Sequence, residues 1–136
     1  MTVEEAITAR VLASPIAPSL AAWNSTRAVH WGCRPEGAGL AAIIFTMIDV
    51  GTAYVHGGRD ALSVPLIQAD VLAESYGKAR TLADMLGRLL EEPAESGAIR
   101  FSHGFIERDA DIPVADVRGA QFIHGRSLRL SLYCKE

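Results

Sequence analysis

The sequence lacks most features that mark membrane, secreted and nucleic-acid-binding proteins. Among its 136 residues, the longest nearly uncharged apolar run covers residues 40–48, far short of the roughly 20 residues that cross a bilayer. The first ten residues lack the basic and then apolar order of a signal peptide. No block of Lys and Arg indicates a nucleic-acid or membrane surface, and the net charge is −3. These absences predict a single soluble, cytoplasmic domain over residues 1–136.

Cysteine is also scarce. Cys33 and Cys134 lie far apart, and no CxxC pair occurs, which predicts two reduced, buried thiols and no disulfide. His30 and Cys33 are spaced like half of a zinc site, and Cys134, His103 or His124 would have to supply the other half. Because the sequence holds only one such close pair, the favoured interpretation is a buried strand residue and a small buried thiol. We therefore predict no metal site.

The sequence patterns of common catalytic sites are absent as well. There is no GxxxxGK[ST] or GxGxxG loop for a phosphate and no GxSxG elbow for a nucleophile. Ser102 adjoins His103, but neighbours on a strand point to opposite faces and do not pair as nucleophile and base. The remaining acidic candidates are scattered along the chain: Asp49, Asp70, Glu74, Glu107, Asp109 and Asp111. We therefore predict a protein that is not an enzyme and that needs no cofactor.

Two helices are predicted. Thr2 and Glu5 form a capping box, and Val3, Ile7 and Val11 follow at helical spacing, which predicts a helix over residues 3–13. A stronger helix begins after Ser75 and ends before Pro93. Its apolar stripe consists of Ala79, Leu82, Ala83, Leu86, Leu89 and Leu90.

The other segments are predicted to be strands, at residues 28–33, 41–50, 61–73, 97–111 and 125–135. The run "AAIIFTMIDV" is apolar at nearly every position, which predicts burial on both faces. Pro65 places the start of its strand at an edge or a bulge. The element order predicts an α+β two-layer sandwich: a mainly antiparallel sheet of about four to five strands with two helices packed on one face.

Some polar residues are unusual in this pattern. Arg59 and Asp60 lie at the Gly-Gly turn "HGGRD". Gln68 and Asp70 share one face of an otherwise apolar strand, and Ile67, Ala69 and Val71 are predicted on its other face. The C-terminal part also carries several arginines: Arg118, Arg126 and Arg129. Such groups suit contacts between subunits, although an ordinary solvent-exposed sheet face explains each of them equally well.

The order of these motifs resembles that of the tail terminator (tail-completion) proteins of long-tailed phages and phage-like gene transfer agents. A short helix precedes "VHWGCRPEGAGLAAIIFTMI", then comes "LIQADVLAESYGKARTLADMLGRLL", and "RSLRLSLYCK" closes the chain. The resemblance covers nearly the whole chain and rests on order, length and degenerate motifs. The connection "DIPVADVRGAQFIHG" has no counterpart that we can place in the family.

The resemblance implies a ring, expected to be a hexamer, that caps the head-proximal end of a tail tube and stops its polymerisation. The implied partners are further copies of the chain, the major tail tube protein and the head–tail connector, with DNA only as passing cargo and no membrane. The protein would be in the host cytoplasm during assembly and then in the tail of the mature virion or gene transfer agent particle, at its head-proximal end. Arg59, Asp60, Gln68 and Asp70 become candidates for the subunit or tube interface. The alternatives are a head-side connector or adaptor of the same particle, and a small oligomeric α+β enzyme or ligand-binding domain.

Overall fold

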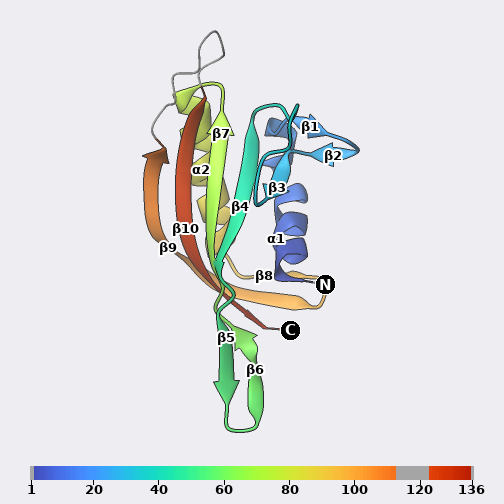
Figure 1. Cartoon of the computed structure of the whole chain (residues 1–136), viewed down its shortest axis with the longest axis vertical. Coiled ribbons are helices and arrows are strands. Elements are labelled where there is room, and N and C mark those ends of the chain that lie inside the picture. The colour runs from blue at the N-terminus through green and yellow to red at the C-terminus, as the bar shows by residue number, and fades with distance from the viewer. Residues whose placement is uncertain (1, 113–122, 136) are drawn as a thin grey trace.

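The computed structural model describes residues 2–112 and 123–135, apart from the side chains of residues 59–61. Within these residues, two α-helices, α1 and α2, a short 3-10 helix and ten strands follow one another (Figure 1). Their bounds are α1 Val3–Leu12, η1 Ala17–Ser19, β1 Ala22–Trp23, β2 Thr26–Arg27, β3 Val29–Trp31, β4 Ala42–Asp49, β5 Thr52–Val55, β6 Gly58–Ser63, β7 Leu66–Ala73, α2 Tyr76–Glu91, β8 Ala94–Ser96, β9 Ile99–Ile112 and β10 His124–Lys135.

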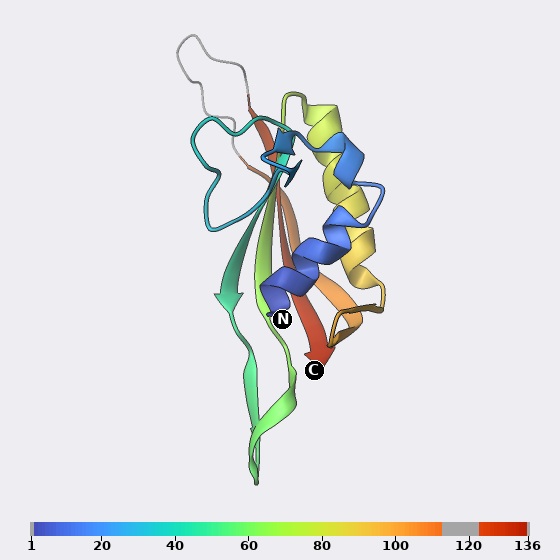
Figure 2. The same ribbon diagram turned by 90° about the vertical axis from the view of Figure 1, so that its right-hand side faces the viewer.

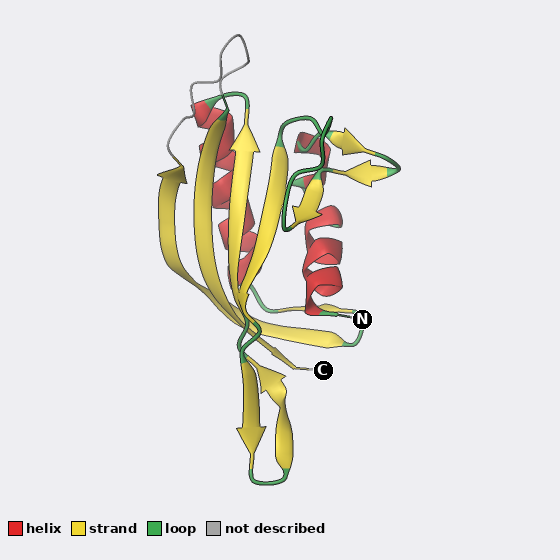
Figure 3. Cartoon of the chain, viewed as in Figure 1, coloured by secondary structure: helices red, strands yellow, loops and turns green. Residues whose placement is uncertain are grey.

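One large curled sheet dominates the structure. Its strand order is β3-β4-β7-β10-β6-β5. Strands β7 and β6 pair with successive parts of the same edge of β10, β9 pairs with the opposite edge of β10, and β8 pairs with β9. Strands β1 and β2 form a separate ribbon. Both helices lie on the same side of the large sheet (Figure 2), and most of the chain outside them is strand (Figure 3).

The predicted small sandwich of four to five antiparallel strands is therefore wrong, although the α+β class holds. The sheet has eight strands and is mixed, because β3 pairs parallel with β4. Residues 32–41 carry the chain back between these two strands, which the sequence analysis read as consecutive antiparallel neighbours. Strands β5 and β8 were not predicted, because four and three residues are too short to show a periodic pattern. The predicted strand over residues 61–73 joined the second half of β6 to β7.

Strand β4 is buried over only part of its length. Ile43 and Phe45 are fully buried, whereas Ile48 and Val50, at and beyond the far end of the strand, are 41% and 62% exposed. The prediction of burial on both faces fails because the helices cover only one face of the sheet (Figure 2): Ile43 and Phe45 are buried, whereas Thr46, on the other face, is exposed.

Helix α2 forms as predicted. The Ser75 hydroxyl accepts a hydrogen bond from the Lys78 amide at 3.2 Å, which caps the first turn. Leu86 and Leu90 are fully buried and Leu82 nearly so, and the helix packs on β10, β7 and β9. No helix among residues 2–112 and 123–135 is long and apolar enough to span a membrane.

Helix α1 is joined to the end of α2 by a buried arginine. The Nη2 atom of Arg10 donates to the Leu89 carbonyl at 2.7 Å and to the Glu92 carbonyl at 2.9 Å. Its guanidinium lies 4.8 Å from the centroid of the Phe101 ring. Burial lowers the pKa of Arg10 below its ordinary value, and the charge of Glu92 works in the opposite direction. Arg10 therefore donates to carbonyls at the C-terminal end of α2, where the Leu89 carbonyl otherwise accepts only a long hydrogen bond of 3.4 Å from the Glu92 amide.

Candidate assembly surfaces

A β-hairpin projects from one end of the sheet, beyond the body of the molecule (Figures 1 and 2). It consists of β5, β6 and their turn, and together with the flanking residues 50–64 we call it the arm. Val50, Tyr54 and Val55 on the arm are 62%, 72% and 56% exposed. A two-stranded hairpin is only marginally stable in water by itself, so this apolar arm is suited to contact with another surface.

The base of the arm is tightly built around a glycine. Gly51 has φ +70°, and its amide donates to the Asp49 carboxylate at 2.9 Å. Its carbonyl accepts from the Val64 amide at 3.1 Å, which closes the hairpin. A Cβ atom at Gly51 would overlap the Val64 carbonyl. The direction of the arm therefore depends on a position that favours glycine both in conformation and in space.

The predicted site residues fall into two separate places. Arg59 and Asp60 lie on β6 of the arm, where the Arg59 backbone pairs with Tyr54, and their side chains are outside the described part of the structure. The turn itself consists of His56 and Gly57, so the "HGGRD" run is partly strand. Gln68 and Asp70 lie instead on β7 in the middle of the large sheet. The structure does not bring the two pairs together.

Gln68 and Asp70 lie on the face of the sheet opposite to the helices, which we call the open face. Both are half-buried, and alternate residues of β7 (Ile67, Ala69, Val71) are buried on the other face, as predicted. The Gln68 amide donates to Asp70 Oδ1 at 3.2 Å and to Oδ2 at 3.4 Å. On this face Thr46 and Arg129 stand opposite Gln68 on the neighbouring strands. The open face is therefore polar at its centre.

The C-terminal arginines do not form one cluster. Arg126 and Arg129 lie on opposite faces of β10, because Arg126 pairs with the buried Val71 and Arg129 with Gln68. Arg118 lies outside the described residues. Nearness in the sequence therefore did not predict a shared arginine surface, because strand alternation places side chains an odd number of positions apart on opposite faces.

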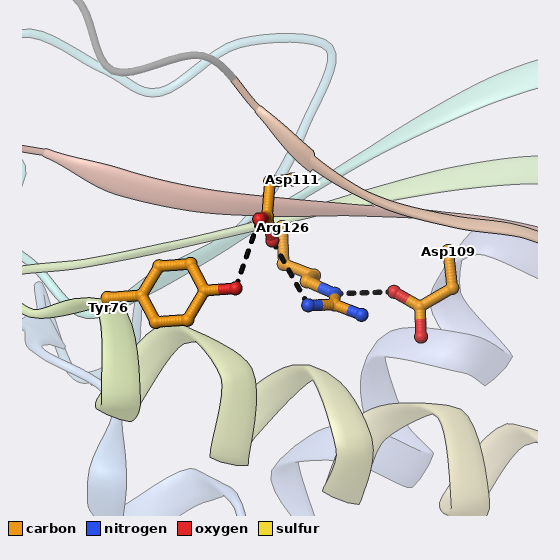
Figure 4. A network of polar contacts seen from close by, with 4 residues as sticks. All are labelled: Tyr76, Asp109, Asp111 and Arg126. Atoms are coloured by element: carbon orange, nitrogen blue, oxygen red, sulfur yellow. Dashed lines mark hydrogen bonds and ion pairs between the residues drawn. The ribbon is translucent and has the colours of Figure 1, made fainter.

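Arg126 belongs to a polar network that the sequence analysis missed (Figure 4). Its Nε and Nη1 atoms lie 2.6 Å from Asp109 and 3.0 Å from Asp111, and the Tyr76 hydroxyl donates to Asp111 at 3.0 Å. The hydrogen bond with Asp109 is the main reason that the pKa of Arg126 is raised. The network ties the ends of β9 and β10 to the start of α2. Only the strand register, with Asp111 opposite Arg126, reveals it.

The zinc candidates separate in the structure. His30 is 7% exposed and packs edge-on against Trp23, with ring centroids 5.7 Å apart. Cys33 is exposed, contrary to the prediction, whereas Cys134 is buried beside Ser63. Within the described residues, no three His, Cys, Asp or Glu side chains are grouped as metal ligands.

A hollow of about 450 Å³ lies between the end of α2 and β9. It is lined by Arg88, Glu91, Glu92, His103, Gly104 and Phe105.

The complete arrangement, a curled sheet with helices on one side and a projecting arm, matches a known fold. In fold, the chain is similar to a gene transfer agent virion protein. A chain from the structure described as "Virion of native gene transfer agent (GTA) particle" superposes with a TM-score of 0.65 and 15% sequence identity, over 98% of this chain and 95% of that chain. No protein-family model matches the sequence, and no curated protein matches it. At this identity the likeness shows the fold alone.

The buried His30 leads to a pH prediction. Burial, followed by the charge of Arg34, lowers the pKa of His30 below its ordinary value. The unfolded chain therefore binds the proton at a higher pH than the folded chain, and stability falls as the pH drops below about 6.5. Chemical denaturation at pH 7.5, 6.5 and 5.5 should show a smaller acid loss in His30→Phe than in the wild type. Equal losses in both proteins would contradict the prediction.

Proposed function

We propose that this protein is a structural, non-enzymatic ring subunit of a phage-like particle. The ring caps the head-proximal end of the tail tube, ends its polymerisation and joins the tail to the head connector, while DNA passes through the lumen. The partners are other copies of the chain, expected to number six per ring, the major tail tube protein and the connector. The protein acts in the host cytoplasm during assembly and then in the mature particle.

The observation that carries this proposal is the fold similarity to a chain of a gene transfer agent virion, because it covers 98% of this chain and 95% of the other. Nearly complete coverage on both sides means that the two chains share one architecture and not merely a common motif. The motif order in the sequence points to the same class of particle independently of the structure.

The two candidate surfaces support an assembly role. A closed ring needs two different patches on each subunit, since its contacts are heterologous. We propose that the arm, with Arg59 and Asp60, reaches the tube or a neighbouring subunit. We propose that the centre of the open face, with Gln68 and Asp70, lines the lumen or meets a neighbouring subunit.

Electron microscopy of particles from a producing strain with this gene deleted tests the proposal. We expect tails of uncontrolled length that are not attached to DNA-filled heads, because nothing ends the tube or forms the joint. A plasmid copy of the gene should restore particles with tails of normal length.

Two other outcomes have distinct meanings. Separate heads and tails, with tails of normal length, would favour the head-side connector or adaptor. Normal particles with attached tails of normal length would exclude both structural roles, and the hollow beside His103 would then be the place to look for a ligand.

A further inference from the structure

The β9–β10 part of the open face brings cations together in an unusual way. Arg108 stands directly opposite Arg129, and Arg100 stands directly opposite Lys135. Like charges directly opposite each other on neighbouring strands destabilise a sheet. We call Arg100, Phe105, Arg108, Arg129, Tyr133 and Lys135 the basic strip.

Carboxylates of the same chain neutralise the positive charge of this strip only in part. Glu95 pairs with Arg100 at 2.9 Å, and Glu107 accepts a hydrogen bond from Ser131 at 2.6 Å. Asp70, on the next strand, accepts from Gln68. Among the described residues neither Arg108 nor Arg129 forms an ion pair, and the Nε atom of Arg129 is buried without a hydrogen-bond partner.

An exposed aromatic pair lies between the two cationic pairs. Phe105 is 56% exposed and Tyr133 is 37% exposed. Their rings meet edge to face with centroids 5.7 Å apart. Aromatic side chains flanked by arginine are enriched at the centres of protein–protein interfaces.

We infer that the basic strip binds a carboxylate-bearing surface of a second copy of this chain. The inference rests on the proposed ring, in which each subunit needs two complementary patches. With its four cations and two adjoining carboxylates, the strip carries +2 in a chain of net charge −3, so the remaining residues carry −5. A neighbouring copy therefore offers the opposite charge, and its approach covers Phe105 and Tyr133.

The same charges disfavour nucleic acid as the occupant. Binding to a nucleic-acid backbone depends on cations that neutralise several phosphates. Here the strip belongs to a subunit whose remaining surface is acidic and repels phosphate. Two of the six residues of the strip are apolar-bodied aromatics engaged with each other, which suits a protein partner better.

Photo-crosslinking in particle-producing cells identifies what covers the strip. A photoreactive benzoylphenylalanine replaces Phe105, and in a matched strain it replaces Arg80, which is exposed on α2. We expect a crosslinked dimer of this chain from position 105 and none from position 80. Mass spectrometry should find the second copy linked through a peptide that contains Asp or Glu. A crosslink from position 105 to DNA, to another particle protein, or to nothing would overturn the inference.

A charge reversal tests the electrostatic part. Arg108→Glu, introduced into the strain with the photoreactive residue at position 105, should lower the yield of the dimer about tenfold or more, since it places a carboxylate against a carboxylate. Arg80→Glu makes the same charge change away from the strip and should leave the yield unchanged. Equal yields in the two variants would contradict the inference. A deletion strain with the expected tail defect, combined with a crosslink to another protein, would leave the proposed function standing and remove only this inference.

Discussion

Replacing Arg10 by methionine is expected to lower the free energy of unfolding by about 3 kcal/mol. The substitution removes the donor that serves the Leu89 and Glu92 carbonyls at 2.7 and 2.9 Å. Methionine fills much of the same volume, so most of the loss reflects two causes. The Glu92 carbonyl loses the Arg10 donor and the Leu89 carbonyl keeps only the Glu92 amide at 3.4 Å, and the contact between the guanidinium and the Phe101 ring disappears. The effect is large because Arg10 is only 7% exposed.

Urea denaturation followed by circular dichroism at pH 7 measures this loss. Arg80→Met is the matched control, because Arg80 is exposed on α2, and its effect should stay within about 0.5 kcal/mol. A loss below about 1 kcal/mol for Arg10→Met would mean that water satisfies the carbonyls and that α1 is not held by this contact.

The role of Arg10 was not predicted from the sequence. The residue lies on the buried side of α1 beside Ala6, Ile7 and Val11, but the apolar pattern alone explained the helix. A charged residue on the apolar face of a helix is a signal that its charge has a specific partner. That partner, the end of α2, is far along the chain and is known only from the tertiary structure.

The elements whose signals are local were predicted well. Helix α2 begins after Ser75 and ends before Pro93, and β10 alternates between buried Leu128, Leu130 and Leu132 and more exposed neighbours. In β9 the alternation of buried Ile99 and Phe101 does not continue to His103, because a register shift puts Gly104 opposite Leu132 and leaves His103 exposed. Bulges of this kind depend on pairing with the partner strand, which a single segment does not encode.

In the candidate site, too, features with a local signal were predicted and features that depend on strand pairing were not. The sequence correctly placed Gln68 and Asp70 on one face of a strand, since strand alternation is local. It did not predict the arm, because "TAYV" is short and the strand that follows begins with Gly and charged residues. It also did not predict the like-charge pairs of the basic strip, because Arg108 and Arg129 become neighbours only through the register of β9 and β10.

Substituting alanine for Gly51 is expected to destabilise the base of the arm, so that the arm loses its fixed orientation while the rest of the protein stays folded. A non-glycine residue at φ +70° is strained by about 1–3 kcal/mol, and the added Cβ would also overlap the Val64 carbonyl. The closing hydrogen bond from the Val64 amide to Gly51 should be lost first. Because local opening of one unit leaves others protected, amides of β5 and β6 should exchange about ten- to a hundredfold faster, and those of β7 and α2 should not change.

Gly57→Ala is the matched control, since a Cβ atom at this turn residue meets nothing within 4 Å. If the arm is an assembly element, Gly51→Ala should reduce the yield of particles with attached tails, and Gly57→Ala should leave it near the wild-type level. Faster exchange in the arm together with a normal particle yield would confirm that Gly51 holds the arm, and it would show that assembly does not depend on the arm's direction.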